Sequence, residues 1–148
     1  MNKAAKKITG ALLAGALGAA SLTGCSSSMD GTQPLLTSGE DTVTVGTGNL
    51  MLRMNQATML SYYSMMGGST AGLWSQDSGD GKTYGDTTKA SVLDELENML
   101  VQKQHAADYD VSISEEEQGK IEEAAQAFMD ANTEETIQNL SVSQSDVE

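Results

Sequence analysis

The 148-residue sequence contains only one cysteine, Cys25, and one histidine, His105. A single thiol cannot form an internal disulfide, although export would permit one. The same scarcity excludes zinc sites that are built from several cysteine and histidine ligands. Basic residues are also few. The part of the chain that follows residue 24 contains five of them and all 21 acidic residues, so its net charge is −16. A surface of this sign repels nucleic acid and anionic lipid headgroups, so we expect neither as a partner.

The N-terminus has the features of an export signal. Lys3, Lys6 and Lys7 give the first seven residues a positive charge, and residues 8–22 carry no charge. This order of a basic and an apolar segment is typical of a signal peptide. The apolar segment is shorter than the roughly 20 residues that a permanent membrane span needs. We therefore predict that residues 1–24 are a signal peptide.

The apolar segment ends in Leu22-Thr23-Gly24-Cys25, which resembles the lipobox of bacterial lipoproteins. Small residues at 23 and 24 let the backbone enter the signal peptidase, and the Cys25 thiolate is the nucleophile that takes up the diacylglyceryl group. The alternative is an ordinary secretory signal with an incidental cysteine. Two or three acyl chains anchor a protein firmly. We therefore expect an exported protein that is lipid-anchored through Cys25 to the extracytoplasmic face of a bacterial membrane.

After Cys25 the chain divides into a tether and one domain. Residues 26–41 are rich in serine and glycine, and we expect a flexible tether that folds into no core. Residues 42–148 predict a mostly α-helical domain of three to five helices after a short N-terminal strand, incomplete at the C-terminus. The strand is predicted at residues 42–45, which alternate β-branched side chains.

The helix starts carry recognisable capping residues. Asn49 favours an N-cap for a first helix that ends near Met66, and a second helix is expected from about Thr87 to Asp108. Ser114 begins a third helix, with a capping box to the glutamate three residues later and two further glutamates in the first turn.

Shorter capping patterns follow at residues 132–135 and 143–146. The last pattern is a helix start without a helix body, so we expect a truncated reading frame or fragment.

The first helix is apolar on more than one face, with 11 apolar residues among the 17 that follow Asn49. Such a helix is either buried or covered by a partner. Methionine recurs on surfaces that accept varied partners, but it also fills irregular cores. Both interpretations stay open at this point. If the helix is a binding surface, the candidate client-binding residues are Met51, Met54, Leu60, Tyr62, Tyr63 and Met66.

Other polar groups give no catalytic or metal site. Asp77, Asp80 and Asp86 lie among glycines but lack the EF-hand spacing and its final glutamate, so we expect solvated turn residues. His105 has no serine or aspartate partner at an interpretable spacing, and adjacent glutamates fan out around a helix. Trp74 is expected to dock back on the domain from an exposed loop. We predict no catalytic residue, no metal and no cofactor.

The order of these elements resembles the N-terminal chaperone domain of the SurA and PrsA class of exported foldases. The resemblance is carried by the strand at Val43–Gly46, the Tyr84-Gly85-Asp86-Thr87 loop, the helix that contains Leu93–Ala107, and the stretch Tyr109–Glu117 with its Ser-Glu-Glu helix start. It covers about residues 41–148. The lipobox and tether are similar to those of PrsA-like lipoproteins in particular.

The resemblance implies a membrane-anchored chaperone or foldase module whose partners are unfolded or newly exported polypeptides. Relatives usually continue into a parvulin-type peptidyl-prolyl isomerase domain, and nothing in this sequence resembles that domain. One alternative is therefore that the chain is part of a peptidyl-prolyl isomerase, and that the catalytic domain is missing from this sequence. Another is a non-catalytic envelope adaptor with one fixed partner.

Overall fold

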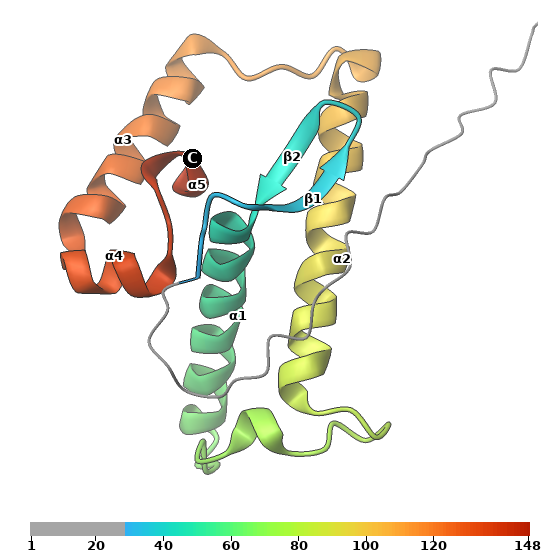
Figure 1. The fold of residues 1–148 in the computed structure, drawn as a ribbon, viewed down its shortest axis with the longest axis vertical. Coiled ribbons are helices and arrows are strands. Elements are labelled where there is room, and N and C mark those ends of the chain that lie inside the picture. Colours follow the sequence, from blue (N-terminus) through green and yellow to red (C-terminus); the bar gives the residue numbers. More distant parts are fainter. Residues whose placement is uncertain (1–28) are drawn as a thin grey trace, which may run out of the picture.

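The computed structural model describes residues 29–148, and the predicted signal peptide and Cys25 lie outside them. The described chain is mostly helical after a short strand hairpin (Figure 1), which confirms the fold class expected from the sequence. In chain order, the elements are β1 (Pro34–Ser38), β2 (Asp41–Thr44), α1 (Val45–Met65), the 3₁₀ turn η1 (Leu73–Ser75), α2 (Tyr84–His105), the 3₁₀ turn η2 (Ala106–Tyr109), α3 (Glu115–Ala131), α4 (Glu134–Leu140) and α5 (Gln144–Val147).

The strand hairpin occupies part of the segment that we expected to be a flexible tether. β1 and β2 pair antiparallel, and Ser38 lies opposite Asp41. Gly39 begins the turn between them with a φ of 61°, which glycine adopts without strain. The tether prediction is wrong for β1. Its composition is polar on average, but Leu35 and Leu36 become half-buried where β1 pairs with β2 and contacts α1 and α2.

The N-cap of α1 is Thr44, and the prediction of Asn49 is wrong. The Thr44 side chain accepts a 3.1 Å hydrogen bond from the Thr47 backbone N–H. Asn49 lies inside the helix, where its buried amide donates to the Leu140 carbonyl at 2.6 Å. From local preference alone, Gly46 and Gly48 indicate a break before the helix, but the fold places both inside α1. A Cβ at Gly48 would lie only 2.2 Å from Leu35 Cδ2, so glycine permits this close approach.

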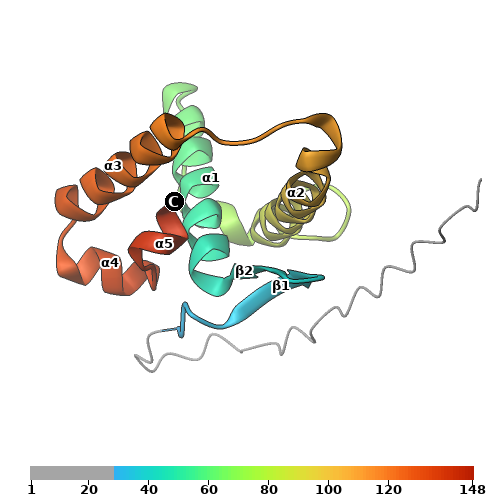
Figure 2. The same ribbon diagram turned by 90° about the horizontal axis from the view of Figure 1, so that it is seen from above.

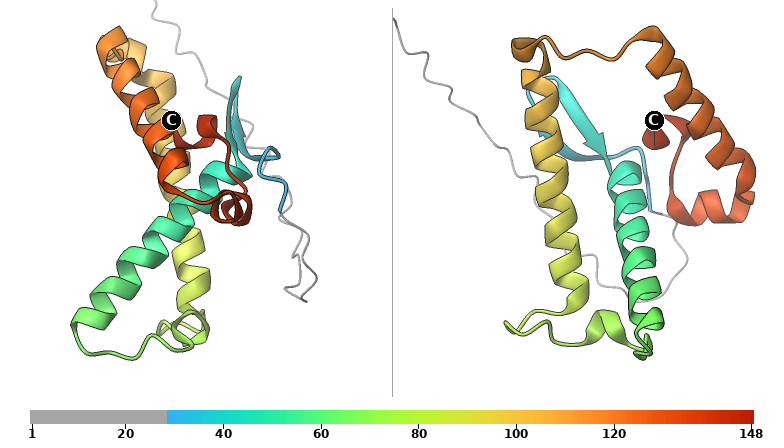
Figure 3. Two further views of the ribbon diagram at one scale, coloured as in Figure 1. Left: turned by 90° about the vertical axis from the view of Figure 1, so that its left-hand side faces the viewer. Right: turned by 180° about the vertical axis from the view of Figure 1, so that it is seen from behind.

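Helices α1 and α2 form an antiparallel pair, and the loop with η1 closes one end of it (Figures 1 and 3). The core includes Val92, Leu96 and Leu100, which recur on one face of α2 at steps of four residues. Met99, next to Leu100 in the sequence, is half-exposed. The loop docks on this core through Leu73, which is 1% exposed, whereas Trp74 is only half-buried.

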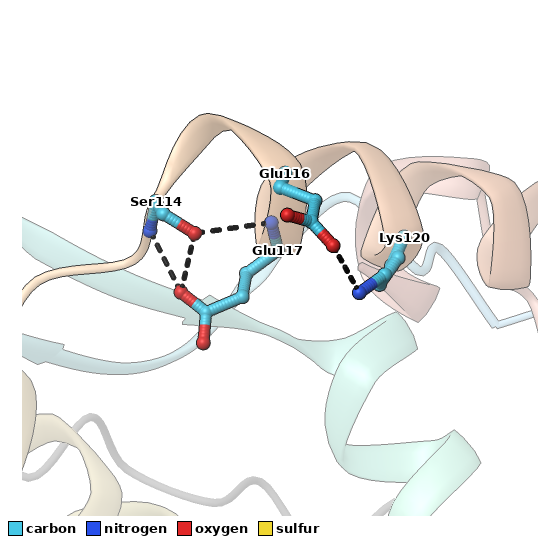
Figure 4. Close-up of polar contacts among 4 residues, drawn as sticks. All are labelled: Ser114, Glu116, Glu117 and Lys120. Atoms are coloured by element: carbon cyan, nitrogen blue, oxygen red, sulfur yellow. Dashed lines mark hydrogen bonds and ion pairs between the residues drawn. The ribbon is translucent and has the colours of Figure 1, made fainter.

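The predicted capping box at Ser114 is confirmed. Its hydroxyl accepts a 3.3 Å hydrogen bond from the Glu117 backbone N–H, and the Glu117 carboxylate accepts from the Ser114 backbone N–H at 2.9 Å (Figure 4). The Ser114 hydroxyl also donates to the Glu117 carboxylate at 2.7 Å, and this bond is the largest cause that holds the pKa of Glu117 below its ordinary value. Lys120 pairs with Glu116 at 2.6 Å on the exposed face, where an ion pair adds little stability.

The C-terminal elements return to the start of α1. Helices α4 and α5 lie beside the first turns of α1 in both views (Figures 1 and 2) and contact it. Helix α4 is capped by Thr133, one residue after the predicted Asn132. Helix α5 has the predicted cap, a box between Ser143 and Asp146. Val142, just before α5, is buried against the domain.

Candidate client-binding surface

Three of the six predicted client-binding residues lie on one exposed face of α1. Met54 is 60% exposed and Tyr62 is 61% exposed, while Met51 on the same face is half-buried. Leu60 and Tyr63 lie on other faces and are half-buried. Met66 is exposed at the C-cap of the helix. The structure therefore brings only part of the predicted set together.

The exposed face continues to a residue that the sequence prediction omitted. Met65 is 85% exposed, the highest value among the exposed large apolar side chains of the described chain. Its position, three residues after Tyr62 and seven after Thr58, was a readable signal. The residues that share this face at steps of three or four are called the methionine ridge; they are Met51, Met54, Thr58, Tyr62 and Met65.

The methionine ridge is long enough to hold a polypeptide segment. From Met51 to Met65 it extends about 21 Å at 1.5 Å per residue. Thr58 is its only polar member, and its hydroxyl donates to the Met54 carbonyl at 3.0 Å. The Thr58 hydroxyl is therefore engaged within the helix, and the ridge offers methionine side chains and the exposed ring of Tyr62.

The interpretation of these methionines as core filling does not hold for the ridge. Apart from Asn49 and the two glycines, Leu50 is the only buried residue of α1, and all four lie in its first turns. Further along the helix no described element covers the ridge, since Met54, Tyr62 and Met65 are all more than half exposed. In the second half of α1, Met65 is a surface residue and Met59 is half-buried.

The ridge is free of charge. Residues 42–76 contain one charged side chain, Arg53. At about 100° per residue, Arg53 lies roughly 140° around the helix from the middle of the ridge, and its guanidinium donates to the Gln56 side-chain carbonyl at 3.2 Å. Covering a charged side chain with apolar groups costs free energy, because the charge loses contact with water. Although the chain has a large excess of acidic residues, this helix has none, so a ligand can cover the ridge without that cost.

An aromatic cluster flanks the end of the ridge. The rings of Tyr62 and Tyr63 meet edge to face with centroids 6.4 Å apart, and those of Tyr63 and Tyr84 do so at 6.3 Å. The Tyr84 hydroxyl raises the pKa of Tyr63 above its ordinary value. The cluster joins the end of α1 to the start of α2 and fixes Tyr62 at the surface.

A second apolar feature lies between the strand hairpin and the two long helices, where the sequence analysis placed no site. It is a cavity of about 320 Å³. Its lining includes β1, both helices and the N-terminal end of the described chain, and Lys89 lies at its edge. The apolar lining residues are Met29, Leu35, Val45, Leu52, Val92 and Leu93. Sequence could not reveal this cavity, because it depends on the packing of β1 across α1.

The acidic residues of the loop before α2 have local structural roles. Asp77 accepts from the Gly79 backbone N–H at 2.7 Å, and Asp80 accepts from the Ser78 hydroxyl. Asp86 bonds Thr83 at the start of α2, which lowers its pKa. Across the described residues, no group of three or more His, Cys, Asp or Glu side chains is placed to hold a metal ion.

His105 forms only a local contact. Its Nδ1 lies 2.8 Å from Asp108 Oδ2, and both side chains are at least half exposed. No hydrogen bond of the described chain links this pair to a serine or another nucleophile. Asp108 is an aspartate partner that was not expected from the sequence, and the pair lies at the C-terminal end of α2.

The remaining findings concern membrane spans, the predicted lipidation site and the comparison with known proteins. No helix of residues 29–148 is long and apolar enough to cross a membrane. Cys25, the predicted lipidation site, lies outside the described residues. A scan against protein-family models and searches of curated proteins and solved structures found no match for this chain.

Proposed function

We propose that this protein is a membrane-anchored extracytoplasmic chaperone module that binds unfolded exported polypeptides on the methionine ridge of α1. One observation carries the proposal: a row of methionine and tyrosine side chains, more than half exposed at three positions, runs along a helix that has no acidic residue. Exposed apolar surface that is contiguous marks interaction sites on soluble domains. Methionine suits varied sequences because its side chain is flexible and polarizable.

The binding mechanism is non-covalent burial of apolar surface. Complete burial of a methionine or tyrosine side chain contributes about 1.5–3 kcal/mol. Met54, Tyr62 and Met65 begin more than half exposed, so covering them yields about 3–6 kcal/mol before the cost of ordering the client. Even before this cost is subtracted, about 3–6 kcal/mol corresponds to a dissociation constant between about 6 mM and about 40 μM, so binding to the ridge is weak. Weak binding allows rapid release, which a chaperone without an energy source requires.

The anchor would place this surface at the membrane where exported chains emerge. The sequence support is the basic and apolar leader followed by Leu22-Thr23-Gly24-Cys25. Strand β1 begins only nine residues after Cys25, so the domain would lie close to the membrane surface. At no more than about 3.5 Å per residue, this segment reaches about 30 Å.

An aggregation assay tests the ridge. The protein should slow aggregation of an unfolded test protein at equimolar or lower ratios. The double variant Met54→Gln and Met65→Gln should lose most of this effect, because it makes the two most exposed methionines of the ridge polar. Met99→Gln is the matched control, since Met99 is also half-exposed but lies on α2. Lack of any effect of the unmodified protein at large excess contradicts the proposal.

The anchor is tested by the intact mass of the protein extracted from its own membranes with detergent. We expect the mass of a chain that begins at Cys25 and carries two or three acyl chains. A mass that includes residues 1–24, or a chain without lipid, contradicts the anchor but leaves client binding in place.

A further inference from the structure

The most exposed sulfur atoms of the described chain belong to α1 and its C-cap. Met54, Met65 and Met66 are 60%, 85% and 70% exposed, the three highest values among the methionines of residues 29–148. These three residues are called the exposed methionine trio. In Figures 1 and 3, α3, α4 and α5 lie beside the first turns of α1, and the second half of the helix extends away from them. A dissolved reagent therefore has direct access to the trio.

Methionine is the only residue of this part of the chain that carries a sulfur atom. The single cysteine of the sequence is Cys25, so no thiol within residues 29–148 competes for an oxidant. A methionine thioether is oxidised at its sulfur, and a sulfur atom that is exposed to the reagent reacts first. The excess of acidic residues repels anionic oxidants, whereas a neutral hydroperoxide is not repelled.

The same helix contains an internal comparison. Met51 and Met59 lie on α1 close to the trio in sequence, but both are half-buried. Met99 of α2 is 51% exposed and stands between the two groups. If exposure controls the reaction, the trio is oxidised first, Met99 next, and the half-buried pair last.

Resting on the function proposed above, we propose that the exposed methionine trio is an oxidation site at which a neutral hydroperoxide forms methionine sulfoxide and thereby switches client binding off. The sulfur lone pair attacks one oxygen of hydrogen peroxide, so a sulfur–oxygen bond forms and the oxygen–oxygen bond breaks. The sulfur loses two electrons and the peroxide gains them. The proton of the transferred hydroxyl goes to the departing hydroxide, which leaves as water. The sulfoxide is polar, so the ridge loses the apolar surface that a client would cover.

Oxidation at the trio acts on the surface and leaves the core in place. None of the three side chains belongs to the buried apolar core, which includes Leu50, Leu73, Val92, Leu96 and Leu100. A polar oxygen on an exposed side chain remains in water, so the packing of the core does not have to change. Methionine sulfoxide reductases restore the thioether, with one enzyme for each sulfoxide epimer. Client binding at this site is therefore reversible by oxidation and reduction.

The first test maps the oxidation of the full protein without any client. Samples taken during treatment with hydrogen peroxide are digested and analysed by tandem mass spectrometry, which assigns each added oxygen to one methionine. The trio should reach half oxidation at least about threefold sooner than Met51 and Met59, because the reaction follows exposure of the sulfur. Equal rates at all of these positions overturn the assigned site.

The second test connects oxidation with client binding. After peroxide treatment, the protein concentration that slows aggregation of an unfolded test protein should rise about tenfold, since the ridge has lost apolar surface. Treatment with both sulfoxide reductases should reverse this rise. The triple variant Met54→Leu, Met65→Leu and Met66→Leu keeps apolar side chains of similar volume without sulfur, so it should keep its activity in peroxide. Met99→Leu is the matched control and should lose activity in peroxide as the unmodified protein does.

The outcomes separate this inference from the function on which it rests. Equal loss of activity in peroxide for the triple leucine variant and the unmodified protein overturns the switch, as does full activity of a protein whose trio is completely oxidised. Loss of helix signal in circular dichroism after oxidation overturns it too, because the change would then lie in the fold. If the untreated protein never suppresses aggregation, the proposed function fails and the switch with it, while the oxidation map still tests the site.

Discussion

The contact between Asp146 and the start of α1 gives the sharpest prediction about the fold. Asp146 Oδ2 accepts from the Ser143 backbone N–H at 2.7 Å and from its hydroxyl at 2.6 Å. Oδ1 accepts from the hydroxyls of Thr44 and Thr47, which are about one hundred residues away in the sequence. One carboxylate therefore caps α5 and joins it to the N-cap of α1. Asp146→Ala removes all four bonds at once.

The expected loss follows from the type and number of these bonds. A hydrogen bond to a charged group contributes about 1.5–3 kcal/mol, and loss of an N-cap costs about 1 kcal/mol. The contributions do not add fully, because the freed hydroxyls turn to water once α5 frays. We expect a loss of about 2–4 kcal/mol in the free energy of unfolding. With a typical dependence of the free energy of unfolding on urea concentration, the urea concentration at the unfolding midpoint falls by about 1–2 M.

Urea denaturation followed by circular dichroism measures this change. Asp130→Ala is the control, because Asp130 is an exposed carboxylate that accepts only a local bond from Gln126, and its loss should stay within about 0.5 kcal/mol. Hydrogen exchange should rise in α4 and α5 of Asp146→Ala and remain low in α2. An unchanged urea midpoint for Asp146→Ala refutes the reasoning that this carboxylate holds the C-terminal unit in place.

The same residue predicts a pH dependence. Burial raises the pKa of Asp146, but the hydrogen bonds from Ser143, Thr44 and Thr47 together outweigh it and leave the pKa below its ordinary value. A carboxyl with a lowered pKa in the folded state stabilises the protein above the unfolded value of about 3.9, and this stabilisation is lost as the pH falls through the folded value. Stability should therefore fall less steeply below about pH 4 in Asp146→Ala than in the unmodified protein. Equal slopes in an acid titration of the two proteins would show that Asp146 is not tied to the fold in this way.

Four further substitutions probe other parts of the structure by urea denaturation. Gly119→Ala should stabilise the protein by about 0.5–1 kcal/mol, because the new Cβ inside α3 meets no atom within 4 Å. Gly31→Ala should destabilise it, because the new Cβ would lie 1.7 Å from the Ser141 carbonyl oxygen. Changes of the same sign in the free energy of unfolding for both variants would contradict these positions. Ser114→Ala should cost about 1 kcal/mol through loss of the capping box, and a neutral result would mean that α3 does not start there. Leu73→Ala should cost about 2–4 kcal/mol because the side chain is almost fully buried, and a loss below 1 kcal/mol would show that the loop does not dock through it.

Features that depend on neighbouring residues could be predicted from the sequence. The box at Ser114 and the cap at Ser143 form between residues three apart, so a local pattern suffices. The stripe of Val92, Leu96 and Leu100 follows from helical periodicity. The mostly helical fold class is the sum of such local signals.

Features set by distant contacts could not be predicted in this way. Glycines 46 and 48 indicate a break when read locally, yet they allow Asp146 and Leu35 to approach α1 closely. Asn49 is a good capping residue, but Leu140 engages it from the far end of the domain. Likewise, the sequence of α1 leaves open whether its methionines are core or surface, since the answer depends on which elements cover the helix. Met65 illustrates this, because its exposure is known only once α2 and α5 are placed.

Direct contact between unfolded clients and the methionine ridge is the central claim, and site-specific photocrosslinking measures that contact. A photoreactive amino acid is placed at position 54 or 65 on the ridge, and at position 99 on α2 as the matched exposed control. After addition of an unfolded test protein and illumination, the account predicts crosslinks to the client from positions 54 and 65, and at most a small fraction of that yield from position 99. Crosslinks of equal yield from all three positions, or none from the ridge, would contradict it.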